Sequence, residues 1–340
     1  MPAVPDRVRV VVALAVVAVL AACAPATPPA ATPRPAQPAP TGGQPSGAPV
    51  KIGFLTPLSG PAAAYGALLK AAPQLVMDEV NAAGGVNGSP LDVVTVDSPN
   101  NPNQALTSLA KLVNDDKVLA IAGPYFTGEA EVVAPRAEQL QVPIAFNALK
   151  PGVVSGDKWA FQFNIPDDRN LPVAIDAFKK VYPDVRKVVV VGDVQTAVTA
   201  SVIKDLWPKL LPQAGYSIVD TVTYDASTTD FSAIATRIKG SGADGMALSS
   251  LSPAAPNLLK ELQRQGVKLP IVSSEHLQTV PPFPEIAGST AEGMIMPFSF
   301  DPSRAGQDAR VKDWLTRYEA IVQPGPSGQK PAIGYALEPL

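Results

Sequence analysis

The sequence has few of the residues from which metal centres and nucleophilic enzymes are built. Its 340 residues include one cysteine and one histidine. This count excludes a disulfide framework, a structural zinc site and any metal cluster built on imidazole or thiolate ligands, so only an all-oxygen metal site would be compatible. The chain also lacks an excess of positive charge: 27 Lys and Arg stand against 30 Asp and Glu. Nucleic-acid binding is therefore not expected.

Sequence motifs for nucleotide binding and nucleophilic catalysis are missing as well. No GxGxxG turn follows the first predicted strand, and the chain contains no GxxxxGK[ST] phosphate loop and no GxSxG elbow. A Ser-His-Asp set would have to use His276, because no other histidine exists. No local spacing singles out a pair of carboxylates for acid/base catalysis. We therefore expect the protein not to be an enzyme and to need no cofactor or metal ion.

The first 23 residues have the features of an export signal. Arg7 and Arg9 precede an unbroken apolar run over residues 10–20, which is too short to span a bilayer as a helix of about 20 residues. The run ends in Leu-Ala-Ala-Cys, with Cys23 last, and resembles the lipobox of bacterial lipoproteins. That resemblance implies an exported protein, lipid-anchored to the cell membrane through Cys23 and facing the periplasm or the cell exterior. The alternative is a plain secretory signal that ends in a cysteine by chance.

Residues 24–49 differ in composition from the rest of the chain. They include nine prolines, no acidic residue and a single basic one, Arg34. Such a segment cannot bury a core and prefers extended conformations, so we expect a spacer between the anchor and a folded region that starts near Val50. The folded region is too long for one ordinary core, which predicts two lobes.

From Val50 onward, apolar runs alternate with helix-like segments. The first series has predicted strands at 50–55, 91–96, 118–122 and 143–146, and predicted helices at 62–83 (kinked at Pro73), 104–114 and 129–140. The second has strands at 187–191, 217–223, 245–248 and 270–272, helices at 199–211, 230–239 and 253–265, then a strand at 293–296 and a helix at 307–321. Apolar runs without alternation are typical of strands covered on both faces. They predict an α/β fold of two doubly wound, Rossmann-like lobes.

Three loops follow predicted strands at the sheet edge where α/β folds bind ligands. They are residues 56–61, with Tyr65 one helical turn later, residues 123–128 and residues 147–151. The second loop opens a helix whose free amides and dipole favour an anion such as a carboxylate. The alternative interpretation of each loop is a structural turn, with glycine and proline present for backbone reasons alone.

Six segments, in order along the chain, carry a resemblance to a known family. They are IGFLTPLSGPAAAYG (52–66), DEVNAAGGVNG (78–88), IAGPYFTG (121–128), VPIAFNA (142–148), TTDFSAIATRIK (228–239) and AEGMIM (291–296). Over residues 50–336 the chain resembles the type I periplasmic binding proteins of the leucine/isoleucine/valine-binding family, the receptors of branched-chain amino acid ABC importers. The resemblance implies two α/β lobes joined by crossing strands at a hinge, a ligand held in the cleft between them, and closure that is sensed by membrane permease subunits.

The resemblance also implies which residues touch the ligand. Thr127 takes the family's hydroxyl position for the ligand carboxylate, and Glu275 takes the position of the acid that meets the ligand ammonium. The full set of expected ligand-binding residues is Ser59, Tyr65, Tyr125, Phe126, Thr127, Asn147, Ala148, Leu149, Gln195, Leu251, Glu275 and His276. For His276 the preferred alternative is an exposed loop residue without a role in the cleft.

Several family positions are changed here. Leu149 stands where the family often has a threonine, and Gln195 lies in a stretch where the family supplies a tyrosine. Tyr125, Phe126 and Leu149 could form an apolar wall for a larger or flatter ligand, and packing within the lobe is the alternative. Retention of Glu275 argues for a cationic or hydrogen-donating ligand end, because an unpaired buried carboxylate is costly.

The domain assignment follows from these expectations. Residues 1–23 are the signal, 24–49 the linker, 50–165 the first part of lobe 1, 166–290 lobe 2, and 291–340 a return to lobe 1. The family pattern continues beyond Ala336 with a helix and a third crossing strand. We therefore expect a truncated chain or a lost hinge strand, and with it lower thermal stability.

The sequence thus predicts a lipid-anchored substrate-binding protein of an ABC importer. Its ligand would be an amino acid or a related small polar molecule, with amides and ureas included. A ligand-sensing receptor domain of the same fold, coupled to a signalling partner, is the alternative. An enzyme is a third reading, disfavoured by the single histidine.

Overall fold

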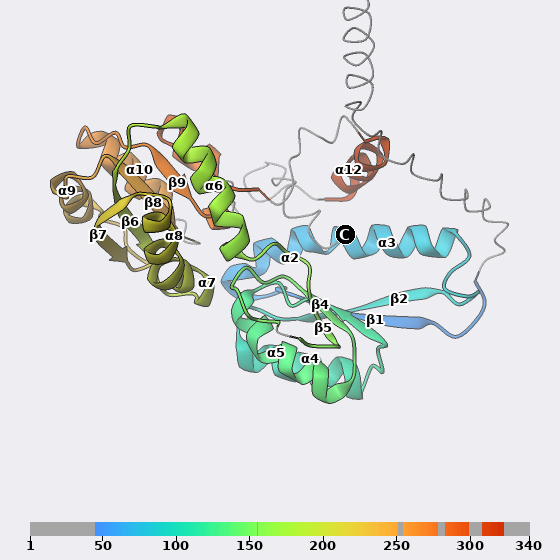
Figure 1. Cartoon of the computed structure of the whole chain (residues 1–340). Coiled ribbons are helices and arrows are strands. Elements are labelled where there is room, and N and C mark those ends of the chain that lie inside the picture. Colours follow the sequence, from blue (N-terminus) through green and yellow to red (C-terminus); the bar gives the residue numbers. More distant parts are fainter. Residues whose placement is uncertain (1–44, 155, 251–253, 278–282, 299–307, 323–340) are drawn as a thin grey trace, which may run out of the picture. The chain divides into compact units, whose positions relative to one another are not determined.

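A computed structural model describes residues 45–154, 156–250, 254–277, 283–298 and 308–322 of the chain. These residues form two parallel sheets, one of five and one of four strands, each with helices on both faces (Figure 1). We call the part around the first sheet lobe 1 and the part around the second sheet lobe 2. Within the described ranges, no helix is both long and apolar enough to cross a membrane.

Lobe 1 is built on a sheet with the strand order β2-β1-β3-β4-β5. Its strands are β1 (Val50–Thr56), β2 (Leu91–Asp97), β3 (Ala120–Ala122), β4 (Ile144–Phe146) and β5 (Ala160–Gln162). Helices α4 (Pro102–Asn114) and α5 (Thr127–Leu140) pack on one face, where their buried Leu109, Leu112 and Val133 meet Ile144 and Phe146. Because every strand pair is parallel and helices cover both faces, the strands carry apolar runs rather than alternating patterns.

Helices α2 (Ala63–Leu69) and α3 (Ala71–Ala82) cover the other face of this sheet (Figure 1). A single helix with a kink at Pro73 was expected here, but the chain has two helices that meet at Lys70. The break has a direct cause: a proline lacks the amide that would bond the carbonyl four residues earlier, and its ring clashes with that carbonyl. For Pro73 that residue is Leu69, the last residue of α2.

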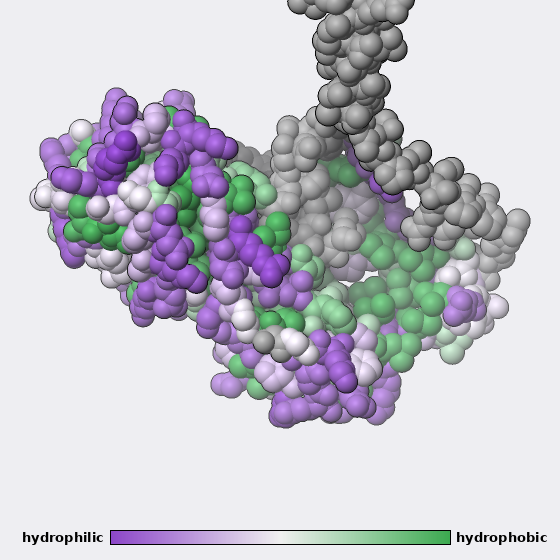
Figure 2. Space-filling model, viewed as in Figure 1, coloured by the Kyte–Doolittle hydropathy of each residue, from purple (hydrophilic) through white to green (hydrophobic). Residues whose placement is uncertain are grey.

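Helix α12 (Ala309–Ile321), the last helix described, packs on this same side of lobe 1. Its Trp314, Leu315 and Tyr318 form a buried cluster with residues of α2 and α3, and the Tyr318 hydroxyl donates to the Leu68 carbonyl at 3.3 Å. Figure 2 shows hydrophobic residues gathered over α3 and the neighbouring β1–β2 pair. Most residues of β2 are only half-buried, as expected for a strand at the edge of the sheet.

Lobe 2 repeats the pattern with the strand order β7-β6-β8-β9. Its strands are β6 (Lys187–Asp193), β7 (Ser217–Tyr224), β8 (Gly245–Ser249) and β9 (Ile271–Ser273). The β6 run is buried on both sides, with Val188 and Val190 in one cluster and Val189 and Val191 in the other. These two clusters explain why the sequence signal was strongest at this strand.

Helices cover both faces of the second sheet. One face carries α6 (Asp167–Val181), α7 (Ala197–Ser201), the π-helical η3 (Val202–Leu206) and α8 (Trp207–Gln213). The other face carries α9 (Ser232–Gly240), α10 (Ala255–Arg264) and α11 (Phe283–Ala287). Short 3₁₀ turns are found at η4 (Glu275–Leu277) and η5 (Gly288–Ala291) in lobe 2, and at η2 (Gly60–Ala62) in lobe 1.

Two further element predictions differ from the structure. The helix expected at 199–211 consists of three consecutive helical segments, α7, η3 and α8. The strand expected at 293–296 is reduced to a single parallel bridge between Ile295 and Val272. Strand β5 and helix α6 were not predicted at all. Helix α6 contains Pro172 and follows Pro166, and two prolines within seven residues argue against a helix from sequence alone.

Candidate functional site

The loop after β1 is fastened to the end of β2. The Ser59 hydroxyl donates to one carboxylate oxygen of Asp97 at 2.5 Å, and the amides of Leu58 and Ser59 donate to the other at 2.7 and 3.2 Å. Ser59 was expected to bind the ligand. Here its hydroxyl proton is already donated to Asp97, which holds the loop in place.

An aromatic cluster lies between this loop and the loop after β3. The ring of Tyr65 is 5.5 Å from that of Tyr125 and 5.6 Å from that of Phe126, and the latter two rings are 5.2 Å apart. Two of the three pairs have edge-to-face geometry, which is the favoured arrangement of aromatic quadrupoles. All three rings are half-buried, so the cluster both packs within lobe 1 and presents an apolar surface.

The start of α5 and the loop after β4 form the expected anion-binding part of lobe 1. Thr127 is the first residue of α5, and its hydroxyl oxygen accepts the Leu149 amide at 3.2 Å. Acting as an acceptor there, the hydroxyl keeps its proton for donation to another group. Among the described residues, no acceptor faces the amides of Thr127, Gly128 or Ala148. Amides at a helix start and a hydroxyl proton together suit a carboxylate.

Asn147 and Ala148 are buried in the same loop. The Ala148 carbonyl accepts the side-chain amide of Gln162 at 2.5 Å, while the Asn147 side-chain oxygen is buried with no described partner. The structure therefore brings Thr127, Asn147, Ala148 and Leu149 together at one end of lobe 1.

Gln195 lies on lobe 2, in the loop after β6. Its side-chain amide donates to Asp225 at 2.5 Å, and its side-chain oxygen accepts the Ala226 amide at 2.7 Å. Both partners belong to the loop after β7. Gln195 is thus held to its own lobe while remaining exposed.

A pocket of about 470 Å³ is lined by residues of both lobes. Lobe 1 contributes Phe126 and Thr127 from the α5 end, and lobe 2 contributes Gln195 and Thr196 from the start of α7. Three of the predicted residues therefore share one pocket. Two other predicted residues, Leu251 and Cys23, lie outside the described residues.

Glu275 and His276 are buried at the carboxyl end of β9, with 4% and 2% of their surfaces exposed. The expectation that His276 is an exposed loop residue is wrong. Its Nε2 lies 3.1 Å from Asp167 Oδ2, and its Nδ1 lies 3.4 Å from the Ser249 hydroxyl. Burial opposes protonation of His276, but the negative charges of Asp167, Glu275 and Asp193 outweigh it and raise the pKa of the imidazole. Glu275 accepts a short hydrogen bond from the side-chain amide of Asn170.

Sequence analysis missed the residues that hold this pair. Asp167 and Asn170 are one turn apart at the start of α6, and both are buried. Asp193, at the end of β6, accepts the Ser250 hydroxyl at 2.6 Å and the Thr199 hydroxyl at 3.1 Å. The apolar residues of α6, at Leu171, Ala174, Ile175 and Phe178, do follow helical spacing, and this periodicity could have located the helix.

A profile of the periplasmic binding protein family matches residues 49–337. The chain belongs to this family. Membership confirms the expected resemblance, the two-lobed α/β fold and the expectation of a binding protein rather than an enzyme. Among relatives, an amino acid binding protein of Pseudomonas aeruginosa is 28% identical over 266 residues, covering 75% of this chain and 68% of that protein. A leucine-, isoleucine-, valine-, threonine- and alanine-binding protein of the same organism is 26% identical over 284 residues, covering 82% and 73%.

Solved structures of binding proteins share the fold. The branched-chain amino acid transporter substrate binding protein LivJ from Streptococcus pneumoniae, in complex with isoleucine, superposes with a TM-score of 0.70 at 26% identity, covering 85% of this chain and 80% of that chain. A solute binding protein of Rhodopseudomonas palustris in complex with 4-hydroxybenzoate has a TM-score of 0.68 at 24% identity, covering 85% and 78%. This second likeness supports the fold alone.

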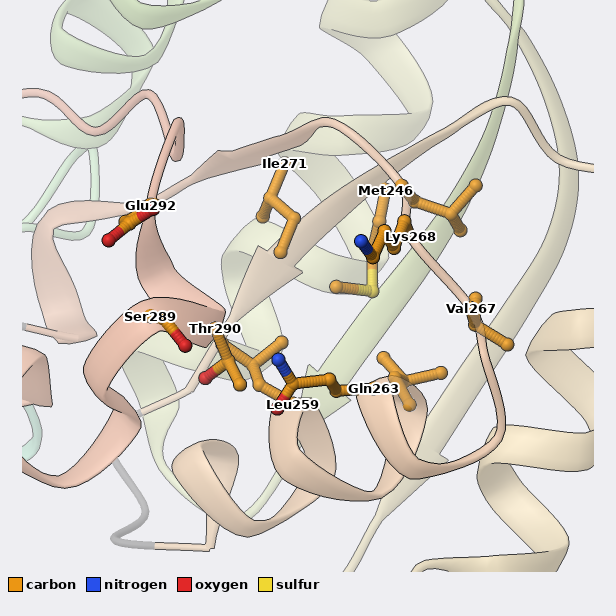
Figure 3. Close-up of a pocket in the computed structure, with 11 residues that line it drawn as sticks. Met246, Leu259, Gln263, Val267, Lys268, Ile271, Ser289, Thr290 and Glu292 are labelled. Carbon is orange, nitrogen blue, oxygen red and sulfur yellow. The ribbon is translucent and has the colours of Figure 1, made fainter.

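A further pocket of this binding protein, of about 430 Å³, lies at the amino ends of β8 and β9 (Figure 3). Its lining includes the apolar Met246, Leu259 and Ile271 and the charged Lys268 and Glu292 (Figure 3). None of the residues predicted to bind the ligand lines this pocket. Because α/β folds bind ligands at the carboxyl ends of their strands, it is not the candidate site.

Proposed function

We propose that the protein is the extracytoplasmic substrate-binding protein of an ABC importer, and that it binds an amino acid or a closely related small molecule between the two lobes. The observation that carries the proposal is the opposite polarity of the two sides. Lobe 1 offers hydrogen-bond donors at Thr127, Gly128 and Ala148, whereas lobe 2 offers the buried carboxylate of Glu275. A zwitterion with a carboxylate at one end and an ammonium at the other matches this arrangement.

Because Glu275 is buried, its carboxylate depends strongly on the charges around it. It accepts from the neutral amide of Asn170, and a carboxylate removed from water is stabilised most by a positive charge. An ammonium that reaches Glu275 from the cleft would stabilise this carboxylate electrostatically. A ligand touching both lobes then favours the closed state by contacts that the open state lacks.

The ligand side chain would face the aromatic cluster of Tyr65, Tyr125 and Phe126. Phe126 lines the pocket shared by the two lobes, and Leu149 adds apolar surface where the family often has a threonine. A larger or flatter apolar side chain is favoured over a small polar one. The named ligands of the relatives, branched-chain amino acids among them, agree with an apolar side chain.

Calorimetric titration with a set of matched compounds tests the ligand class. L-leucine, its amine analogue without the carboxylate, and its acid analogue without the ammonium separate the two polar ends. We expect measurable binding of L-leucine or L-phenylalanine and at least tenfold weaker binding of both truncated analogues, since a hydrogen bond to a charged group contributes about 1.5–3 kcal/mol.

Variants of lobe 2 assign the ammonium end. Glu275→Gln keeps the shape and removes the charge, so it should weaken amino acid binding about tenfold or more and leave binding of the acid analogue unchanged. Glu292→Gln removes an exposed glutamate from the same lobe and is the matched control. Equal affinity of the wild-type protein and Glu275→Gln for L-leucine would show that Glu275 does not meet the ligand.

The membrane anchor and the domain assignment belong to the same proposal. Acylation of Cys23 would tether the binding protein through the Pro/Ala-rich spacer of residues 24–49. The packing of α12 on α3 supports a return of the chain to lobe 1, but at residues 309–321 rather than from residue 291, because Ile295 still pairs with Val272 of lobe 2. Mass spectrometry of the mature amino terminus tests the anchor: a diacylglyceryl cysteine is expected, and Cys23→Ala should release the protein from membranes. Cleavage before an unmodified residue would contradict it.

A further inference from the structure

The first turn of α6 contacts Glu275 and His276, two consecutive residues of the loop after β9, which we call the ligand loop of lobe 2. Asp167 and Asn170 are three residues apart, so their side chains lie on the same face of the helix. Asn170 donates to Glu275, and Asp167 lies within hydrogen-bond distance of His276. Each of the four side chains is buried.

The same turn also contacts the loop after β4, residues 147–149, which we call the ligand loop of lobe 1. The Asp167 amide donates to the Leu149 carbonyl at 2.7 Å, and the Leu149 amide in turn donates to the Thr127 hydroxyl at 3.2 Å. Asp167 therefore joins the loop that would hold the ligand carboxylate to the loop that would hold the ligand ammonium. The connection continues on the lobe 2 side through His276 to Ser249, whose hydroxyl is 2.9 Å from that of Ser274.

We propose that Asp167 and His276 form a positioning pair that couples the two ligand loops, so that ligand affinity depends on the protonation of His276. This inference rests on the proposed function for the identity of the ligand, but not for the coupling between the loops. In this proposal neither residue touches the ligand, although His276 was among the residues expected to bind it. Asp167 acts through His276 on one side and through Leu149 on the other.

The charges around His276 give the direction of the effect. The groups facing it are Asp167 from α6, Asp193 from β6, and Glu275 from its own loop, with the neutral Ser249 from β8. All three charges favour the protonated imidazole. An ammonium bound at Glu275 adds a positive charge nearby and so disfavours that protonated form. By linkage, the ligand binds more tightly to the protein with neutral His276, and affinity rises as pH increases through the pKa of His276.

A titration without ligand tests the pair directly. His276 is the sole histidine of the chain, so ¹³C-labelled histidine gives one NMR signal that needs no assignment. We expect a midpoint above the ordinary pH of about 6.5. Asp167→Asn should lower the midpoint by at least one pH unit and should shift the Leu149 resonances. Asp168→Asn, which makes the same change at the exposed neighbouring residue, is the control and should do neither. A midpoint that Asp167→Asn leaves unmoved would overturn the proposal.

A second measurement compares the affinity for L-leucine between pH 5.5 and 8.5 in the wild-type protein and in His276→Gln, whose amide can still donate to Asp167. The wild-type affinity should rise about fivefold or more across the range. The affinity of the variant should lack the part of this pH dependence that is due to His276. The difference between the two profiles therefore separates His276 from other groups that titrate in the same range. Identical pH profiles would overturn the proposal. If neither protein binds L-leucine or L-phenylalanine, the proposed ligand class fails, and the ligand-free titration still decides the positioning pair.

Discussion

Glu129 gives the sharpest test of the physical account, because a single buried proton should control part of the stability. The side chain is fully buried in the first turn of α5. One carboxylate oxygen accepts the Ser98 hydroxyl at 2.7 Å and the Asn101 amide at 3.0 Å, and the other is buried with no described partner. Burial raises the pKa of Glu129 from 4.5 to about 7, although its hydrogen bonds act in the opposite direction.

The sign of the stability change follows from this shift. The unfolded chain loses the Glu129 proton near pH 4.5, whereas the folded protein keeps it up to about pH 7. Between these values the folded state binds more protons, so the free energy of unfolding falls as pH rises and then levels off above pH 7. A shift of this size corresponds to a loss of about 3 kcal/mol. Glu129→Gln cannot ionise and should lack this loss.

Urea unfolding at intervals from pH 4.5 to 8.5 measures the effect. The stability of Glu129→Gln relative to the wild-type protein should increase by about 3 kcal/mol from the acidic to the basic end, with unchanged denaturant slopes. Glu131→Gln is the matched control, because it removes a glutamate from the same helix whose side chain is 32% exposed. Parallel stability curves for the wild-type protein and Glu129→Gln, within about 1 kcal/mol, would refute the assigned burial and pKa of Glu129.

Three further predictions concern packing, and thermal or urea unfolding checks each. Gly66→Ala would place a Cβ 1.9 Å from the Pro57 carbonyl oxygen, so it should destabilise lobe 1 by about 1–3 kcal/mol. Gly240→Ala is the control, because its Cβ would have no atom within 4 Å and should not destabilise the protein. Equal effects of the two substitutions would contradict the close approach at Gly66. Trp207→Ala removes the largest fully buried side chain and should cost about 3–5 kcal/mol, and a loss below 1 kcal/mol would mean that the lobe 2 core is not packed as described. Tyr318→Phe removes the hydrogen bond to Leu68 and should lower the free energy of unfolding by about 1 kcal/mol, while the amides of α12 stay protected from hydrogen exchange. Loss of protection throughout α12 would show that this bond, rather than the apolar cluster, holds the helix.

The sequence was sufficient for the architecture because parallel strands covered on both faces leave a strong pattern. The run of four valines in β6 is buried alternately in two cores, as expected of a strand that is covered on both faces. Tertiary contacts were harder to predict. Pro73 was expected to bend one helix, yet it separates two, and the segment at 293–296 has apolar residues suited to a strand but pairs at Ile295 alone.

In the candidate site, too, the positions of the loops were predictable and the side-chain contacts were not. The residues of lobe 1 come from loops at successive strand ends, and neighbouring parallel strands bring such loops together by topology, so Thr127, Asn147 and Leu149 were predictable as a group. Gln195 lies on lobe 2, and its two hydrogen bonds to the loop after β7 depend on side-chain geometry that sequence spacing does not indicate.

Helix α6 shows why the remaining part of the site escaped prediction. Its first residues are Asp167 and Asp168, followed by an asparagine at position 170 and a proline at 172, a composition typical of an exposed turn. In the structure two of these polar residues point inward and are stabilised by partners more than 100 positions away, at His276 and Glu275. Local pattern treats a polar residue as exposed, and a buried polar residue is stable only when a distant partner satisfies it. Asp167 and Asn170 were therefore the hardest residues to predict, because their burial depends on contacts with the ligand loops. The same contacts make these two residues candidates for controlling the site.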